Sequence, residues 1–249
     1  MNSKAAFGQF RISFWLTLLS FGAFALMFWL YVAAEKRIDQ VNDQRFLAHQ
    51  LCDDLMRTSE DLTRFARAYV LTGKPQYRAY FNEITEVRDG KRPGLLPGEH
   101  AYHDLTPAYE PGQHPPAQSP AIPLLQQLGA AGMSDQEFEL LLLAKTNSDT
   151  LTVLENKAMD MVAQAGPDAV AVREQAQKLL YGEEYRVAKL NILAPIEKAH
   201  QTMSERLDGL LRDSVQHAWR LRLAFLLLGL VSLGMLGRAY RQLQRILGA

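Results

Sequence analysis

The sequence predicts an all-α protein in which two transmembrane helices flank an extracytoplasmic up-and-down helical bundle with a long proline-rich loop. Three observations support this fold class. Two uncharged apolar stretches, 12–34 and 223–237, lie near the two ends of the chain. The polar region between them carries apolar residues at spacings of three and four, as in amphipathic helices that pack on partner helices. Almost none of it alternates apolar and polar residues as a strand does.

The first apolar stretch, 12–34, contains no charged residue. As a helix it extends about 35 Å, enough to cross a hydrocarbon core of about 30 Å with some tilt. A cleaved secretion signal is the alternative, since Val32, Ala33 and Ala34 offer small residues to a peptidase. A transmembrane helix is favoured because the stretch exceeds the usual apolar core of such signals, about 7–15 residues, and a second span follows.

The second span is placed at 221–237, around a shorter uncharged core at 223–237. That core extends only roughly 22 Å as a helix. Crossing a bilayer therefore requires neighbours such as Trp219, with Arg220 and Arg222 directed toward the outer headgroups.

Charge asymmetry predicts the orientation. The two tails, 1–11 and 238–249, hold five basic and no acidic residues, whereas all 27 acidic residues lie between the spans. Because basic loops stay cytoplasmic, both termini are expected in the cytoplasm and 35–220 on the opposite side of the membrane. Membrane lipid is therefore an expected partner. The formal net charge of zero argues against nucleic acid as a partner.

An amphipathic helix is expected to follow the first span without a break. No glycine or proline lies between Gly22 and Gly73, so the helix runs to Thr72. Gly73 and Pro75 end it, and a second helix runs from Pro75 to about Asp89. The buried stripe of the first helix is predicted to contain Val41, Ala48, Leu51, Leu55, Leu62, Phe65 and Tyr69.

Residues 90–123 hold eight of the eleven prolines, so regular structure is not expected there. A mobile cap at the membrane-distal tip is the favoured interpretation of this long loop. The best candidates for metal ligands lie in it: His100, His103, His114, Glu99 and Asp104. Their pattern lacks cysteines and a helical frame, so no metal is predicted.

Four helical segments are predicted after the loop. A brief one covers 123–131, and a capping box of Ser134 and Glu137 opens the next, which runs to about Gln164. Its expected buried residues are Leu140, Leu141, Ala144, Leu151, Leu154, Ala158 and Met161. A further helix covers 167–181. From Glu183 one long helix, bent near Pro195, returns to the second span.

The cytoplasmic tail repeats apolar residues at steps of four, three and four. These residues are Leu236, Tyr240, Leu243 and Leu247. They form either the start of a dimeric coiled coil or a short amphipathic stop-transfer tail. The single cysteine, Cys52, excludes an internal disulfide and suits a helix interior, with an intermolecular bridge or a redox sensor as alternatives.

Three blocks of the central region occur in a characteristic order. They are DLTRFARAYVLTG at 61–73 with Tyr77, Tyr80, Phe81 and VRDGKRP at 87–93; NSDTL at 147–151 with Glu155, Ala158 and Met159; and Ala188, Lys189, Ile192 and API at 194–196. Together, over about residues 55–200, they resemble the helical sensor region of bacterial two-span signalling proteins. In those proteins this region precedes chemoreceptor, sensor histidine kinase, diguanylate-cyclase or adenylate-cyclase outputs. The resemblance implies a location in the bacterial inner membrane, with 35–220 in the periplasm.

Two features depart from that family pattern. Relatives tend to show an aromatic cluster with tryptophan and aspartate after the Lys-Arg-Pro element, whereas this chain has no tryptophan between Trp29 and Trp219. A ligand contact by such a cluster is therefore not expected. Only twelve residues follow the second span, so the output is expected either in a longer protein or in a separate signalling chain.

A polar ligand cavity is predicted near the membrane-distal end of the bundle, where arginine can pair an anionic group bidentately. Its candidate residues are Arg64, Arg67, Tyr69, Tyr77, Tyr80, Asn147, Tyr185 and Lys189. The alternative is that these residues are structural, as ion pairs on a solvated face, packed tyrosines and a buried asparagine that sets helix register.

No catalytic residue, metal or cofactor is predicted, because the sequence lacks a phosphate-binding glycine loop, a G-x-S-x-G motif and an H-E-x-x-H motif. The predicted function is that of a homodimeric sensor rather than an enzyme. Its bundle detects a small molecule or a periplasmic protein and passes the signal to a cytoplasmic output by helix displacement. A constitutive membrane-anchored scaffold that binds a periplasmic partner is the alternative.

Overall fold

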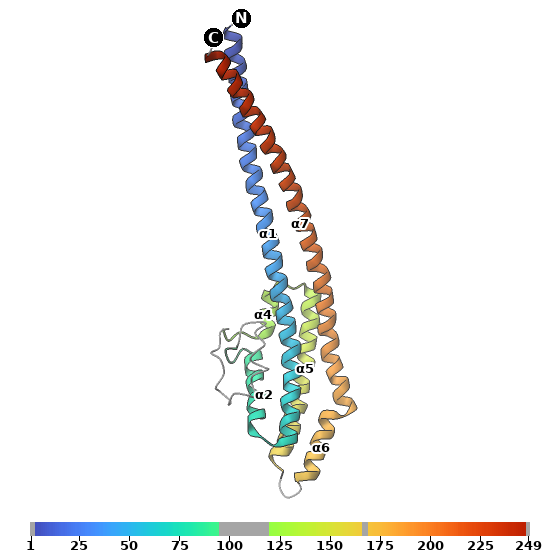
Figure 1. The fold of residues 1–249 in the computed structure, drawn as a ribbon. Coiled ribbons are helices and arrows are strands. Elements are labelled where there is room, and N and C mark those ends of the chain that lie inside the picture. The colour runs from blue at the N-terminus through green and yellow to red at the C-terminus, as the bar shows by residue number, and fades with distance from the viewer. Residues whose placement is uncertain (1–2, 95–119, 166–168, 248–249) are drawn as a thin grey trace. The chain divides into compact units, whose positions relative to one another are not determined.

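The computed structural model describes residues 3–94, 120–165 and 169–247 (Figure 1). In these ranges the chain forms α1 (Ser3–Thr72), α2 (Pro75–Arg88), α4 (Leu124–Ala130), α5 (Asp135–Ala163), α6 (Ala169–Tyr181) and α7 (Glu183–Leu247). No strand occurs in the described ranges, so the prediction of an all-α chain is confirmed for them. Most of the predicted proline-rich loop, residues 95–119, lies outside the described residues.

The helices pack into two compact units. The span unit comprises Met1–Asp43 and Leu207–Ala249, and the bundle unit comprises Gln44–Arg206. Helices α1 and α7 contribute to both units, and each is one unbroken helix. The predicted continuation of the first helix to Thr72 is confirmed.

The span unit exposes large apolar side chains on both of its helix segments. Leu19 on α1 is 73% exposed and Leu230 on α7 is 68% exposed. Exposed apolar surface is unfavourable in water by about 25 cal/mol per Å² and is accommodated in lipid without that penalty. Both helices are long and apolar enough to cross a membrane.

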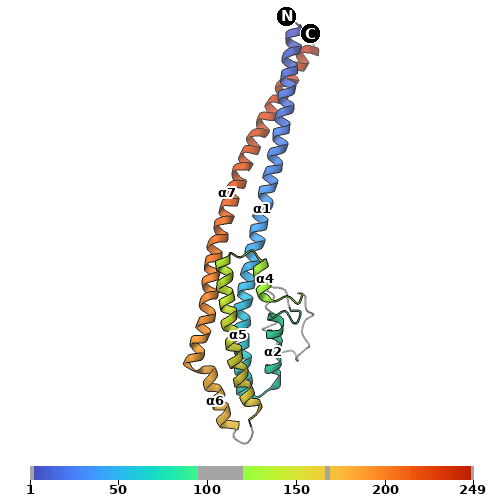
Figure 2. The ribbon, with the colours of Figure 1, turned by 180° about the vertical axis from the view of Figure 1, so that it is seen from behind.

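An aromatic cluster joins the two segments of the span unit. The ring centroid of Phe225 lies 4.6 Å from that of Phe24, 5.6 Å from that of Phe28 and 6.2 Å from that of Tyr31. A Cβ added at Gly229 would lie 3.0 Å from the Phe24 ring. A small residue here thus lets the helices approach closely, as is common between transmembrane helices. The first turn of α1 and the last turn of α7 lie at the same end of this unit (Figures 1 and 2).

Across the page in both views, the helices of the bundle unit follow in the order α2, α1, α5 and α7 (Figures 1 and 2). Helix α2 also contacts α5 directly, through Arg88. The predicted stripe of α1 is buried at Ala48, Leu51, Leu55, Leu62, Phe65 and Tyr69, whereas Val41 is only half-buried. On α5 the predicted Leu141, Ala144, Leu151 and Ala158 are buried, whereas Leu140, Leu154 and Met161 are half-buried. Ser148, Glu155 and Met159, which were not predicted, are buried on this helix as well.

Turn geometry follows the predicted signals. Gly73 and Gly90 both have φ of 71°, the left-handed conformation that favours glycine after a helix. The capping box of α5 is also present. The Glu137 N–H donates to Ser134 Oγ at 3.3 Å, and the Ser134 N–H donates to Glu137 Oε2 at 2.8 Å.

Gly90 also permits a close approach of two chain segments. A Cβ added at Gly90 would lie 2.4 Å from Pro123 N and 2.8 Å from Ile122 C. Replacement by alanine therefore adds a backbone clash to the left-handed conformation.

We expect Gly90→Ala to lower the free energy of unfolding by about 2 kcal/mol or more. Gly209→Ala is the matched control, because nothing lies within 4 Å of a Cβ added there in the interior of α7. It should leave stability unchanged or raise it by up to about 1 kcal/mol. Thermal unfolding followed by circular dichroism measures both, and equal stabilities for the two variants would contradict the expected clash.

Candidate functional site

A buried polar network joins three helices inside the bundle unit. Glu155 on α5 is 1% exposed. Its Oε1 accepts hydrogen bonds from Tyr185 OH on α7 at 2.5 Å and from Thr63 Oγ1 on α1 at 3.2 Å. Tyr185 OH also lies 2.9 Å from Thr63 Oγ1. One carboxyl group thus connects α5 to both long helices.

Glu155 differs from the other acidic residues buried in the described part of the chain. Each of the others pairs with an arginine: Asp61 with Arg64 at 2.8 Å, Glu83 with Arg92 at 3.4 Å and Glu137 with Arg206 at 2.8 Å. Among the described residues, no cation forms an ion pair with Glu155. A buried carboxylate without a counter-charge is strongly disfavoured relative to its protonated form.

The environment of Glu155 changes its acidity accordingly. Burial raises the pKa of Glu155 to about 7, although hydrogen bonds from Tyr185 and Thr63 and the charges of Lys189 and Arg88 act to lower it. Burial, together with the Glu155 carboxylate, also raises the pKa of Tyr185. Near neutral pH, Glu155 therefore changes its charge while Tyr185 keeps its proton.

The cation one turn from Tyr185 is engaged elsewhere. Lys189 Nζ donates to Ser59 O at 3.2 Å and to Ser59 Oγ at 3.3 Å. It also pairs with the Glu60 carboxylate at 3.0 Å. Lys189 therefore ties α7 to α1 directly and acts on Glu155 only through its charge.

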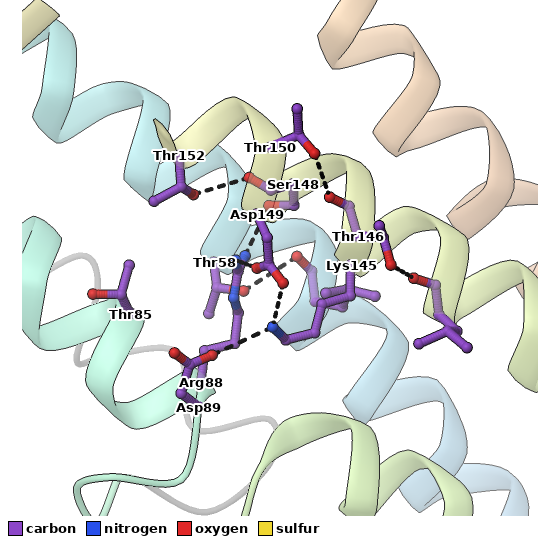
Figure 3. Close-up of polar contacts among 12 residues, drawn as sticks. Thr58, Thr85, Arg88, Asp89, Lys145, Thr146, Ser148, Asp149, Thr150 and Thr152 are labelled. Carbon is purple, nitrogen blue, oxygen red and sulfur yellow. Dashed lines mark hydrogen bonds and ion pairs between the residues drawn. The ribbon is translucent and has the colours of Figure 1, made fainter. Parts of the chain in front are cut away.

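A second polar cluster lies where α2 meets α5 (Figure 3). The Arg88 side chain is 2% exposed and donates to Ser148 Oγ at 2.8 Å and to Asp149 Oδ1 at 2.7 Å. Lys145 Nζ lies 2.7 Å from Asp149 and 3.3 Å from Asp89. Two cations and two carboxylates thus alternate and satisfy one another. The cluster is an inter-helix contact, although Arg88 Nε is buried without a hydrogen-bond partner.

The two clusters bring together sequence blocks that are far apart in the chain. VRDGKRP supplies Arg88, which contacts Ser148 and Asp149 of NSDTL. Thr63 of the first block contacts Glu155, which follows NSDTL. The motif residues therefore have a structural use, since they hold α1, α2 and α5 together.

Three of the predicted ligand residues lie around the network, namely Arg67, Tyr185 and Lys189. Arg67 donates to Leu180 O from Nε at 3.1 Å and from Nη2 at 2.8 Å, and its guanidinium lies 5.0 Å from the centroid of the Tyr185 ring. Its position joins α1 to the end of α6. These contacts bind the arginine to the protein itself.

Arg64 lies outside this group. Its side chain is exposed, pairs with Asp61 and lies 4.6 Å from the centroid of the Phe65 ring.

The remaining predicted residues pack separately. Tyr77 and Tyr80 lie with their ring centroids 6.3 Å and 5.3 Å from that of Phe65. Tyr69 is buried, with the Arg78 guanidinium 5.9 Å from its ring centroid. Asn147 Nδ2 donates to Asn191 O on α7 at 2.9 Å. All eight predicted residues thus have contacts within the chain, and a ligand role for them stays a prediction.

Sequence reasoning did not select Glu155 or Thr63 as site residues. A signal for Glu155 was present, because it lies four residues after Leu151 and three before Ala158, on the buried stripe of α5. An acidic residue at such a position predicts a buried carboxylate. Thr63 follows the stripe residue Leu62 and gives no comparable signal.

Two histidines, also not selected from the sequence, connect α1 and α7. His49 Nδ1 lies 2.8 Å from His200 Nε2, and the rings meet edge to face. One imidazole must donate and the other accept, so the contact cannot hold when both are doubly protonated. Each histidine adjoins a buried alanine, Ala48 or Ala199, which places it at the edge of the helix interface.

The predicted metal candidates in the proline-rich loop lie outside the described residues. These are His100, His103, His114, Glu99 and Asp104. Within the described ranges, no group of three or more His, Cys, Asp and Glu side chains could hold a metal ion. A groove of about 460 Å³ on α1 and α7 is lined by Asp53, Met56, Arg57, Glu60 and Leu193, none of which was predicted as a ligand contact.

Comparisons with protein-family models, curated proteins and solved structures found no match for this chain. The resemblance to two-span sensor regions therefore stays a prediction from the sequence blocks.

We expect the stability of the protein to fall as pH rises through the range in which Glu155 titrates. The folded state holds the Glu155 proton up to about pH 7, whereas an unfolded glutamate loses it near 4.5. The contribution is therefore fully present below pH 4.5 and lost as pH rises through 7, by on the order of 3 kcal/mol. Glu155→Gln should remove this slope, which denaturant unfolding at several pH values measures. A wild-type slope equal to that of the variant would contradict the expectation.

Cys52 provides a second prediction. It is buried, and burial, with the charges of Asp53 and Glu137, raises the pKa of its thiol to about 12. Because the thiolate is the nucleophile, we expect Cys52 to resist thiol reagents in the folded protein and to react on unfolding. Spectrophotometric thiol titration with and without denaturant tests this, with Met56→Cys as the exposed control on the same helix. Rapid reaction of native Cys52 would contradict its burial and favour a redox or bridging role.

Proposed function

We propose that this chain is the membrane-anchored input module of a bacterial signal-transduction system. The bundle unit lies in the periplasm, both termini are cytoplasmic, and the chain acts as a homodimer in the inner membrane. Binding of a small molecule or a periplasmic protein to the bundle unit displaces α1 or α7. The displacement passes through the spans to an output domain or a separate signalling protein.

One observation carries this proposal. The helices that contain the apolar spans, α1 and α7, are the same helices whose Thr63 and Tyr185 meet at Glu155. A change of packing in the bundle unit therefore acts on helices that continue into the spans without a break. Packed helices move between discrete arrangements by shifts of about 1–2 Å, which suits a mechanical relay.

The end of α7 supports a dimeric output. Leu236, Tyr240 and Leu243 are exposed in the single chain, at the spacing of a coiled-coil seam. A second copy with the same membrane orientation runs parallel to the first, so these residues can meet their counterparts across a twofold axis. The covered seam would receive the displacement of the second span.

The alternative is a constitutive scaffold that binds a periplasmic partner and has no second state. One observation favours it. All eight residues predicted to contact a ligand are already bound to neighbours in the chain, including Asn147 to Asn191 and Arg67 to Leu180. A scaffold needs no ligand cavity, whereas a receptor must open some of these contacts.

Cysteine cross-linking in membranes separates the two functions. Single cysteines are introduced at Leu236, Tyr240 and Leu243, with Arg241→Cys as the off-seam control, in a Cys52→Ala background. Oxidation is then compared across amino acids, organic acids, sugars and inorganic ions. We expect seam positions to cross-link more than the control, and at least one compound to change their relative yields. Unchanged yields across the whole panel would favour the scaffold.

A further inference from the structure

We propose that Glu155 is a proton-binding site through which the bundle unit responds to pH, so that the proton is itself an input signal. Protonated Glu155 favours the packing of α1, α5 and α7 described above, and ionised Glu155 loosens it. This inference rests on the proposed sensor function and names its signal. It uses a group that is buried where Thr63 of α1 and Tyr185 of α7 share a hydrogen-bond network with α5.

Glu155 has no ion-pair partner among the described residues. Within the described ranges, Glu155 accepts hydrogen bonds only from the hydroxyl groups of Thr63 and Tyr185, which carry no charge. A charge added to a buried network raises the free energy of the folded state, because water cannot solvate it there. Ionisation of Glu155 therefore penalises this packing specifically.

Polar and charged side chains from three other helices surround Glu155. From α7 it is faced by Tyr185 and Lys189, from α2 by Arg88, and from α1 by Thr63. Lys189 is held by Ser59 and Glu60, and Arg88 is held by Ser148 and Asp149. Both cations act on Glu155 through their charge, and neither forms an ion pair with it in the described part of the chain.

Loss of its proton changes the hydrogen bonds that the Glu155 carboxyl group can form. A protonated carboxyl group can donate one hydrogen bond as well as accept, whereas a carboxylate only accepts. The ionised group can therefore accept a further hydrogen bond, which Lys189 would supply by a shift of α7 against α5. Because Lys189 lies four residues beyond Tyr185 on the same helix, such a shift changes both contacts of α7 with the network.

The titration range makes the two states accessible. Burial raises the pKa of Glu155 to about 7, so both forms are populated near neutral pH. Glu137 has the opposite behaviour. Although burial opposes it, the hydrogen bonds and charge of Arg206 lower the pKa of Glu137, which therefore stays ionised in this range.

Distance measurements between spin labels test the proposal. The labels are attached to Val153→Cys on α5 and Val187→Cys on α7, two exposed positions, in a Cys52→Ala background. The full chain is held in lipid nanodiscs and measured by pulsed electron paramagnetic resonance between about pH 5.5 and 8.5. We expect the α5 to α7 distance distribution to shift or broaden by about 2 Å with a midpoint near neutral pH. Glu155→Gln should keep the low-pH distribution throughout.

Two control variants separate Glu155 from other titrating groups. Glu83→Gln alters a buried acid that pairs with Arg92, and His200→Gln removes the imidazole contact with His49. Both should retain the pH response of the wild type. Loss of the response in His200→Gln, or its persistence in Glu155→Gln, would overturn the assignment to Glu155.

The remaining outcomes are also decisive. If Glu155→Gln does not fold, Tyr185→Phe replaces it, since loss of the donor to the carboxylate should move the midpoint to higher pH. An unmoved midpoint would overturn the proposal, as would a wild type without any pH response. If the wild type shows no pH response but a compound changes cross-linking at Leu236, Tyr240 and Leu243 at constant pH, the pH-sensing proposal fails and the sensor function stands. If neither pH nor any compound has an effect, both the pH-sensing proposal and the sensor function fail.

Discussion

Helices α1 and α7 each meet two physical requirements along one unbroken length, and this constraint organises the structure. In the span unit their large apolar side chains, such as Leu19 and Leu230, are exposed and suit lipid. In the bundle unit the same helices bury one apolar stripe and present polar residues elsewhere. Because each helix is unbroken, its backbone groups stay paired within the helix along this length.

Inside the bundle unit, specificity of packing rests on a few buried polar contacts. Aliphatic stripes favour burial but do not select one register, because one apolar surface resembles the next. Arg88 with Asp149, Glu137 with Arg206 and the hydroxyl groups around Glu155 each require a particular partner. Two of these three contacts are ion pairs, in which each charged group lies beside one of opposite charge. The third leaves the buried Glu155 carboxyl group without an ion-pair partner among the described residues, so its ionised form is not stabilised as the other buried charges are.

The same contacts explain the sequence blocks without reference to a ligand. DLTRFARAYVLTG, VRDGKRP and NSDTL contain the residues that join α1, α2 and α5, including Thr63, Arg88 and Ser148. Residues that resemble a binding motif can therefore be needed for architecture. A receptor built on this frame would have to bind its ligand by changing some of these contacts, and the protonation of Glu155 is the smallest change of that kind.

The sequence by itself determined the helices and their ends. Gly73, Gly90 and the Ser134 capping box act locally through backbone geometry, and the apolar stripes follow the helical period. Only the tertiary structure decided which polar residues meet, because Thr63, Glu155 and Tyr185 come from three helices and their spacing along the chain carries no information about contact. The charge state of Glu155 likewise depends on its burial and on the positions of Lys189 and Arg88, neither of which pairs with it in the described part of the chain. These are properties of the packed interior and not of the residue.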